Sequence, residues 1–371
     1  MYSEMIKIIE GGLNCDRSRV YSYSLKLIDE LEKVNEKLLA RKIRNILEEK
    51  KNTMAVLEQF SGKPVDQESR MDMVQISVPK LEESLILDNR TANEINDFIK
   101  IIKNRNKLLQ RGINENMSML LYGYPGCGKT SIAEMISNKL QLPLVTVRFD
   151  TIISSLLGST SKNIRKVFEY ATSKPCILFL DEFDVVAKAR DDTNEVGELK
   201  RVVNTLIQNI DLYINQGGIL IAATNHEELL DKAIWRRFGY ALEITKPLKN
   251  EIKRFIIELL NSYHFKLDKD SKIDRLSEIF ENMSYSEIKE VMLGIIKKAI
   301  IDDEQYLKFA DIVYETYLHK KKDIRDEEEM IKFLKENDVT QIEISKLLKV
   351  SMRRVREFEG DIWWKSFLLL I

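Results

Sequence analysis

The sequence predicts an α/β fold in which a parallel sheet carries helices on both faces, and three observations predict it. Between residues 81 and 247, short apolar runs alternate with longer segments of helical periodicity. One apolar run leads straight into a glycine-rich loop, and a helical segment follows that loop. Helical patterns alone occupy the chain before and after this region. The predicted strands are 119–123, 144–149, 176–181, 218–224 and 241–245.

The chain divides into five segments by these patterns. Its start shows apolar residues at helical spacing, and Asp16 is placed to cap the second run. Gly62, Pro64 and Pro79 indicate a linker, and a charge run at 320–329 marks another boundary. We therefore predict a helical N-terminal domain (1–60), a linker (61–80), an α/β domain (81–247), a helical domain (248–320) and a helical C-terminal appendage (321–371).

The composition is that of an ordinary globular protein that can bury a core, with 44% hydrophobic and 32% charged residues. The 58 basic residues nearly balance 59 acidic ones, so any contact with nucleic acid or a membrane would have to be local. Three widely spaced cysteines show neither a disulfide framework nor metal-ligand spacing. No apolar run resembles a signal peptide or reaches the roughly 18 residues that span a bilayer. We expect a cytoplasmic protein without a membrane partner.

The glycine-rich loop at 123–130 reads Gly-Tyr-Pro-Gly-Cys-Gly-Lys-Thr, the pattern G-x-x-x-x-G-K-[ST]. In this pattern, backbone N–H groups surround the phosphates of a nucleotide. The loop lies between a predicted buried strand and the N-terminus of a predicted helix, whose dipole favours anions. The sequence therefore predicts a P-loop that binds a nucleoside triphosphate.

Each position of the loop has a predicted role. Glycines permit positive φ angles, Lys129 supplies charge to the β- and γ-phosphates, and Thr130 offers a hydroxyl to Mg²⁺. Cys127 is expected to be a small filler; the alternative is an oxidisable thiol, because helix N-termini depress thiol pKa values. The predicted nucleotide-binding residues are Gly123, Tyr124, Pro125, Gly126, Cys127, Gly128, Lys129, Thr130 and Ser131.

Two carboxylates end the predicted strand 176–181. Asp181 at the strand terminus would hold Mg²⁺ together with Thr130, and Glu182 would act as general base on the attacking water. A strand that ends in acids is common by itself. Downstream of a phosphate-binding loop, it predicts the second half of a nucleotide-hydrolysing site.

Further polar residues follow the later strands. Asn225 comes directly after strand 218–224, where its amide would orient the lytic water; the alternative is a turn-forming asparagine. Arg236 and Arg237 follow a short helical stretch, and arginine is suited to stabilise charge on a transferring phosphoryl group. The alternative for this pair is a solvated surface position.

Taken in order, these motifs resemble those of the AAA family of ATPases, over about residues 85–300. The resemblance implies that Asn225 is the sensor 1 residue and that Arg236 and Arg237 are fingers that reach into a neighbouring subunit's site. It therefore implies a ring, usually a hexamer, with 81–247 as the large ATPase subdomain and 248–320 as its helical lid. The lid lacks the arginine that many related ATPases carry as sensor 2. The motifs that carry the resemblance are Gly123–Thr130, Phe179–Asp184, Ala223–Asn225 and Ala233–Phe238.

Leu156 occupies the position where polypeptide-threading members of this family usually carry an aromatic pore residue. Leucine can grip an apolar side chain but has no stacking face. The resemblance therefore implies limited remodelling of a protein client more readily than processive unfolding.

A narrower resemblance is to bacterial AAA ATPases encoded beside subtilisin-like serine proteases in plasmid-maintenance and phage-defence cassettes. It rests on the helical start with Asp16 and on the stretches 181–203 and 225–238. It implies that the ATPase restrains or feeds a protease partner. This chain has three histidines, none beside a serine or cysteine elbow, so the sequence shows no protease site of its own.

The segment 341–358 has the spacing of a helix-turn-helix, with Val350 and Val355 as core positions. Lys349 stands where the tight turn usually has glycine, and Ser345 occupies the small-residue position. Five basic and two acidic residues give the segment a charge of +3. The exposed cations predicted to face DNA are Arg353, Arg354 and Arg356. The alternative for this segment is a small helical unit for protein contacts. The apolar end 362–371 is expected to be a packing or partner surface, with peripheral membrane attachment as the alternative.

The sequence as a whole predicts a ring-forming, Mg²⁺-dependent ATPase that remodels or controls a protein partner. The alternative is a DNA-binding regulator that uses ATP as an assembly switch and reads DNA through 341–358.

Overall fold

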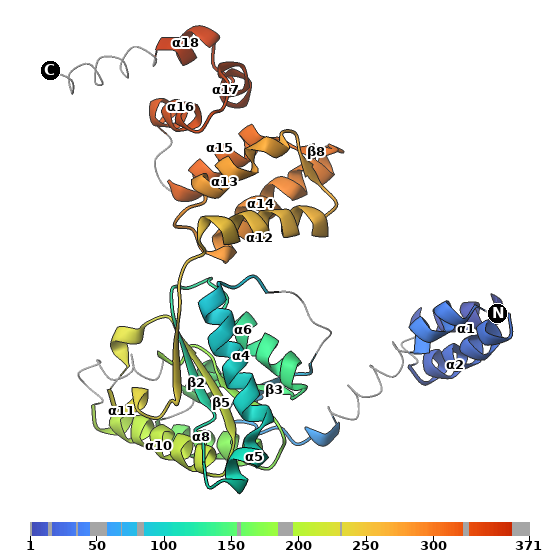
Figure 1. The fold of residues 1–371 in the computed structure, drawn as a ribbon, viewed down its shortest axis with the longest axis vertical. Helices are drawn as coiled ribbons and strands as arrows, with labels where there is room; N and C mark the ends of the chain where they lie inside the picture. The colour runs from blue at the N-terminus through green and yellow to red at the C-terminus, as the bar shows by residue number, and fades with distance from the viewer. Residues whose placement is uncertain are drawn as a thin grey trace.

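The computed structural model divides into an α/β layer, a helical body above it and a set of N-terminal helices (Figure 1). The residues that the structure describes are 2–13, 17–34, 36–44, 58–67, 69–79, 85–153, 157–184, 196–230, 232–321 and 326–357.

The α/β layer is built on a six-stranded sheet in the order β1-β3-β4-β5-β2-β6. Every neighbouring pair is parallel except β1 and β3, which are antiparallel. This confirms the predicted fold class. The strands are β1 (Val74–Ser77), β2 (Ser118–Gly123), β3 (Leu144–Val147), β4 (Ile177–Leu180), β5 (Ile219–Thr224) and β6 (Tyr240–Ile244).

Strand β1 lies within 61–80, a range for which we expected a linker and no strand. Its four residues, Val-Gln-Ile-Ser, are too short a run for the alternation of apolar and polar residues to stand out in the sequence. Pairing with β3 makes the strand, because Val74 lies opposite Val147 and its side chain is buried.

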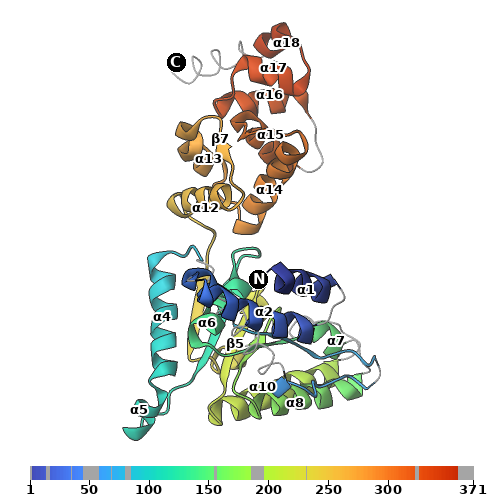
Figure 2. The same ribbon diagram turned by 90° about the vertical axis from the view of Figure 1, so that its right-hand side faces the viewer.

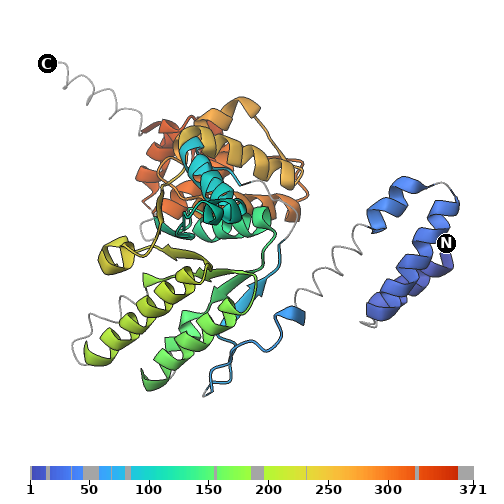
Figure 3. The same cartoon turned by 60° about the horizontal axis from the view of Figure 1, so that its bottom comes forward.

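The two faces of the sheet enter different cores because successive side chains of a strand point in opposite directions. Leu120, Leu178 and Leu220 belong to one core, with residues of α7, α8 and α10. Their neighbours Leu121 and Phe179 belong to the other, with α4 and α6. Figure 3 shows α8 and α10 side by side as the green and yellow-green helices. The covering helices are α4 (Asn89–Lys103), α6 (Lys129–Leu140), α7 (Phe149–Ile153), α8 (Leu157–Thr172) and α10 (Val196–Asn215).

The helical body continues the chain after β6, beyond the carboxyl ends of the strands (Figure 2). Its elements are α12 (Lys249–Ser262), β7 (Lys266–Leu267), η2 (Asp270–Lys272), α13 (Ile273–Ile279), α14 (Tyr285–Ile301), β8 (Tyr306–Leu307) and α15 (Phe309–Lys320). Three further helices are α16 (Glu327–Glu336), α17 (Gln341–Leu348) and α18 (Met352–Glu357). Ile331, Ile344 and Val355 of these helices are buried in the same hydrophobic core as α12 to α15.

The N-terminal helices α1 (Tyr2–Leu13) and α2 (Arg17–Lys33) pack on each other with a helix at 37–44. A small core of Leu27, Ile28, Leu31 and Ala40 holds them together. Asp16, the predicted cap, lies outside the described residues. Among the helices that the structure describes, none combines the length and apolarity needed to cross a bilayer.

Candidate active site

The phosphate-binding motif forms a tight loop between β2 and α6. Gly123, Gly126 and Gly128 have φ angles of 126°, 72° and 96°, which side chains other than glycine rarely adopt. A Cβ atom on Gly123 would lie 2.3 Å from the carbonyl oxygen of Ile244 on the adjacent strand. The loop conformation therefore depends on glycine at these positions, as the motif predicts.

Lys129 is the first residue of α6, and its side chain is buried inside the loop. Its Nζ donates hydrogen bonds to the carbonyl oxygens of Gly123, at 2.7 Å, and Tyr124, at 2.8 Å. Burial lowers the pKa of the Lys129 ammonium. A buried cation that is bonded to neutral acceptors is stabilised further by an anion, because charge-assisted hydrogen bonds are the stronger kind.

Thr130 and Asp181 come into direct contact, although 51 residues separate them in the chain. The Thr130 hydroxyl donates to Oδ2 of Asp181 at 2.9 Å. A hydroxyl and a carboxylate are oxygen ligands of the kind Mg²⁺ prefers, and this ion commonly takes one or two such ligands beside substrate phosphates. No group of three or more His, Cys, Asp or Glu in the described ranges could hold a metal by itself. The pair therefore fits a magnesium ion that arrives with a nucleotide.

Glu182 turns the chain sharply after β4. Its φ angle is 51°, a left-handed conformation that costs a non-glycine residue about 1–2 kcal/mol. Its backbone N–H donates to Oδ1 of Asp181 at 3.0 Å, and the next N–H, that of Phe183, donates to the carbonyl of Ala223 at 2.9 Å. These bonds fix the turn and leave the Glu182 side chain exposed at the sheet edge.

The end of β5 lies beside the loop. Thr224 pairs with Tyr122 across the two strands, so Asn225 follows at the level of Gly123. Asn225 is half-buried. The carboxyl edge of the sheet thus brings together the loop, the acidic pair and Asn225.

Asp184 and Thr224 support this edge and were not predicted as site residues. The Thr224 hydroxyl donates to Oδ1 of Asp184 at 3.1 Å and accepts from the N–H of His226 at 3.0 Å. Both side chains are buried. Both residues lie in the stretches that carry the family resemblance, Phe179–Asp184 and Ala223–Asn225, but the sequence did not assign them a role.

Arg236 and Arg237 lie at the opposite end of the sheet, after η1 (Glu227–Leu229) and α11 (Lys232–Trp235). The Arg237 carbonyl accepts hydrogen bonds from Asn116, at 2.8 Å, and Ser118, at 3.0 Å, where β2 begins. The length of β2, about 17 Å, separates this point from the loop. The structure therefore does not bring the two arginines to the loop of their own chain.

The two arginines differ in their surroundings. The Arg237 guanidinium donates to Asp211 at 3.3 Å and to the carbonyl of Ala233 at 2.8 Å. Arg236 is exposed. Arg237 is thus held within its own chain, while Arg236 faces outward.

The helical body touches the loop directly, a contact that the sequence did not indicate. The N–H of Ser286, at the start of α14, donates to the Gly126 carbonyl at 3.1 Å. A Cβ atom on Gly126 would lie 2.8 Å from Oγ of Ser284. The Tyr285 hydroxyl donates to the Ile86 carbonyl at 3.2 Å. The N-terminus of α14 is therefore seated on the phosphate loop.

Cys127 is buried, and burial raises the pKa of its thiol. The alternative of an activated thiol required a lowered pKa, so the structure favours the small-filler interpretation.

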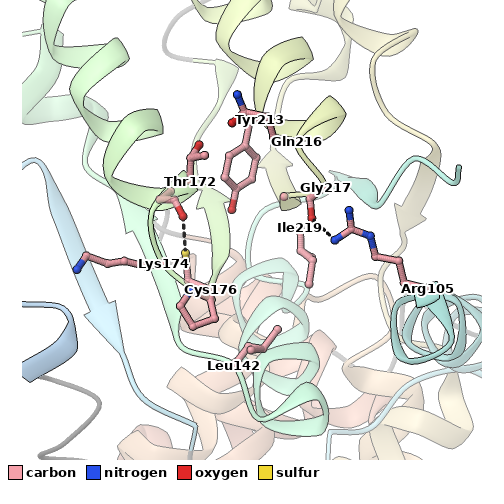
Figure 4. Close-up of a pocket in the computed structure, with 12 residues that line it drawn as sticks. Arg105, Leu142, Thr172, Lys174, Cys176, Tyr213, Gln216, Gly217 and Ile219 are labelled. Atoms are coloured by element: carbon pink, nitrogen blue, oxygen red, sulfur yellow. Dashed lines mark hydrogen bonds between the residues drawn. The ribbon is translucent and has the colours of Figure 1, made fainter. Parts of the chain in front are cut away.

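A separate cavity of about 240 Å³ opens at the amino edge of the sheet, beside α5 (Arg105–Gln110) (Figure 4). Arg105 crosses its rim and donates to the Gly217 carbonyl at 3.0 Å. Cys176 lines it, and burial raises the pKa of this thiol to about 11. The cavity does not include the phosphate loop, so it is not part of the candidate site.

The helix-turn-helix geometry predicted for 341–358 is present in α17 and α18. Lys349 adopts a left-handed conformation with φ of 56°, as the glycine usual at this turn would. The Ser345 hydroxyl donates to the carbonyl of Val350 at 2.6 Å, and Val355 is fully buried.

The arginines of this segment have acidic or polar neighbours. Arg354 donates to Glu327 of α16 at 3.3 Å and to Glu357 at 3.4 Å. Arg353 pairs with Glu357 at 3.4 Å, and Arg356 donates to Gln341 at 3.4 Å. The positive charge of the segment is thus partly neutralised. Leu156, the predicted pore residue, and the apolar end 362–371 lie outside the described residues.

A glycine-rich loop after β2, acidic residues at the end of β4 and the observed strand order define a P-loop nucleoside triphosphatase. A family model described as "ATPase family associated with various cellular activities (AAA)" matches residues 119–246. The chain is also 37% identical to an uncharacterized AAA family ATPase of Sinorhizobium fredii over 288 residues, 77% of this chain and 86% of that protein. The chain belongs to the AAA family, and these matches indicate that it hydrolyses ATP.

Other relatives are named for the proteasome. Proteasome-activating nucleotidase 1 of Haloferax volcanii is 29% identical over 71% of this chain, which covers 66% of that protein. A putative 26S proteasome regulatory subunit homolog of Methanothermobacter thermautotrophicus is 31% identical over 53% of each chain. The crystal structure of the FIGL-1 AAA domain matches 66% of this chain and 85% of that one, with a TM-score of 0.54 and 18% identity, which supports the fold alone.

Proposed function

We propose that this chain is a ring-forming, Mg²⁺-dependent ATPase, most simply a hexamer, that remodels or controls a protein partner. The observation that carries the magnesium site is the 2.9 Å contact between the Thr130 hydroxyl and the Asp181 carboxylate. Of the residues that the structure describes, these two join the phosphate loop to the acidic strand end.

In this proposal the carboxyl edge of the sheet performs the chemistry. Lys129 leaves the loop carbonyls to bind the β- and γ-phosphates, and Thr130 and Asp181 hold the magnesium ion. Glu182 takes a proton from the attacking water, which Asn225 orients. The glycine N–H groups of the loop bind the remaining phosphate oxygens.

The position of the arginines supports the ring. The Arg237 carbonyl lies at the start of β2, about 17 Å from the loop of its own chain, so an arginine finger in this segment would act on a second subunit's nucleotide. Arg236 is exposed and serves as the finger, whereas Arg237 is held by Asp211 and anchors the segment. A catalytic arginine supplied by a neighbour makes hydrolysis depend on assembly.

A protein client is supported by the names of the proteasomal relatives, although the chain covers only 53% to 66% of those proteins. The more specific proposal, a subtilisin-like serine protease partner in plasmid maintenance or phage defence, rests on the narrower sequence resemblance. A cytoplasmic location fits the cysteine usage of the sequence.

A trap experiment tests the proposal. The E182Q variant should bind ATP without turning it over, and so hold its client. We expect a protein partner to co-purify with E182Q in ATP and Mg²⁺, but not with K129A, which cannot load nucleotide. Equal recovery with both variants would contradict an ATP-dependent client.

The alternative, a DNA-binding regulator, is favoured by one observation, the helix-turn-helix geometry of α17 and α18. Removing α16 to α18 would expose the shared core, so the test should change surface charge instead. If duplex DNA raises ATPase activity and the double variant R353E/R356E loses this effect, the regulator is favoured. If duplex DNA does not change the ATPase activity, the DNA-binding regulator is contradicted and the protein-client proposal remains.

A further inference from the structure

One lysine outside the motifs touches both the helical body and the phosphate loop. Lys246 lies in the short segment between β6 and α12. Its Nζ donates to the carbonyl of Asn282, between α13 and α14, at 2.7 Å. The same Nζ lies 4.9 Å from the centroid of the Tyr124 ring. A single ammonium group, on the segment between β6 and α12 (the hinge), therefore contacts both the helical body and the phosphate loop.

Both contacts are attractive, and each is stronger for a cation than for a neutral group. An ammonium that donates to a carbonyl makes a charge-assisted hydrogen bond, and an ammonium within about 6 Å of a ring centroid makes a cation–π contact. The Tyr124 side chain is 57% exposed, so the structure holds its ring at the loop surface rather than in a core. Lys246 is its cationic neighbour there.

Tyr124 is held from a second side by the buried lysine of the loop. Its carbonyl accepts from Lys129 at 2.8 Å, while its ring lies under Lys246. In the proposed mechanism, Lys129 leaves this carbonyl when it binds phosphate. When nucleotide binds, Tyr124 therefore loses its hydrogen bond from Lys129 but keeps its contact with Lys246. Lys246 in turn contacts the helical body.

We propose that Lys246 is a positioning residue that couples phosphate occupancy of the loop to the seating of the helical lid. It acts through Tyr124 and Asn282 and sets how long nucleotide stays bound. The inference rests on the proposed nucleotide site and adds to it a lid contact made from the hinge. It places a cation between the phosphate loop and the helical lid, which lacks the sensor 2 arginine of many related ATPases.

The contact between the Ser286 N–H and the Gly126 carbonyl is made by main-chain atoms. It stays available when the Lys246 side chain is changed, so a Lys246 variant should fold and keep its lid docked. The expected defect is faster release of the bound nucleotide, not a failure to assemble the site.

The experiment measures release of a fluorescent ADP analogue from the full-length chain by stopped flow. We expect K246M to release it at least about fivefold faster than wild type, with KM for ATP raised more than kcat is lowered. K246R keeps a cation and should restore release to near the wild-type rate. K249M is the matched control, because Lys249 pairs with Glu278 inside the helical body, at 2.5 Å, and should release ADP at the wild-type rate.

Tyr124 variants test the route. Y124F keeps the ring, so K246M should still speed release in a Y124F background, whereas K246M should have little further effect in a Y124A background. Equal release by K246M and K249M would overturn the inference, as would an undiminished K246M effect in Y124A. If wild type itself fails to bind the ADP analogue, the nucleotide site is wrong; normal binding with unchanged release in K246M is evidence against the lid contact alone.

Discussion

The two ends of the strands in the six-stranded sheet, its carboxyl edge and its amino edge, differ in the contacts that their polar groups make. At the carboxyl edge, Lys129, Thr130 and Asp181 bond to one another or to the loop, in contacts that a phosphate and a metal ion can replace. At the amino edge, the side chains of Ser118 and Asn116 donate hydrogen bonds to the main-chain carbonyl of Arg237. Binding of a nucleotide does not require these two bonds to break. One edge is therefore built for exchange with a ligand, and the other for holding a segment in place. Substitutions at the first should cost activity. Substitutions of Ser118 and Asn116 at the second should cost stability, whereas the exposed Arg236 there is proposed to act on a neighbouring subunit.

The largest effect on nucleotide binding is expected from K129A. Loss of the buried ammonium removes the charge that faces the phosphates, so ATP affinity should fall by about 100-fold or more. Isothermal titration calorimetry measures the affinity, and the melting temperature should stay near that of wild type. Retained affinity would contradict the assignment of the carboxyl edge.

R236A should lower kcat by about 10³-fold without changing ATP affinity, because the arginine acts on a neighbour's nucleotide. Mixing R236A with K129A subunits should restore part of the activity, since each K129A subunit supplies an intact arginine to an R236A site. Failure of this rescue would count against action between subunits. R237A should instead lower the melting temperature, since Arg237 is bonded within its own chain.

E182Q should lower kcat by about 10²-fold or more while ATP affinity stays the same, because the amide cannot accept the water proton. Steady-state turnover and equilibrium binding, measured on the same preparation, separate the two effects. Equal turnover in E182Q and wild type would remove Glu182 from the chemistry.

The smallest effect is expected from S118A at the amino edge. The Ser118 hydroxyl also accepts from the N–H of Gly239 at 3.0 Å, so its removal takes one partner from that N–H and one from the Arg237 carbonyl, which Asn116 still contacts. The free energy of unfolding should fall by about 0.5–1.5 kcal/mol, with ATP affinity unchanged. Chemical denaturation checks the first expectation and calorimetry the second. A large loss of ATP affinity in S118A would contradict the proposed difference between the two edges.

Most features formed by residues close together in the chain could be predicted from the sequence. The loop, the acidic pair and five of the six strands of the main sheet are short patterns whose meaning depends on neighbouring residues, and this sheet then brings Thr130 to Asp181. Strand β1 could not be predicted, because its four residues become a strand only by pairing with β3.

The remaining features depend on contacts between distant parts of the chain. Ser286 is 160 residues from Gly126, and no spacing rule relates them. The charge of 341–358 suggested a DNA surface, yet Arg354 bonds to Glu327, which lies outside that window. Counting charges in one segment cannot reveal a neutralising partner supplied by another.

The core shared by α12 to α15 and α16 to α18 has a mechanical consequence. Since both groups of helices are packed around one set of buried side chains, we expect them to move as one rigid unit if the helical body rotates about the segment that contains Lys246. Figure 1 places α17 and α18 at the far end of this unit from the sheet. A small rotation at the nucleotide would thus sweep the outermost helices through a longer arc, so a label on α17 would report each catalytic step from a distance.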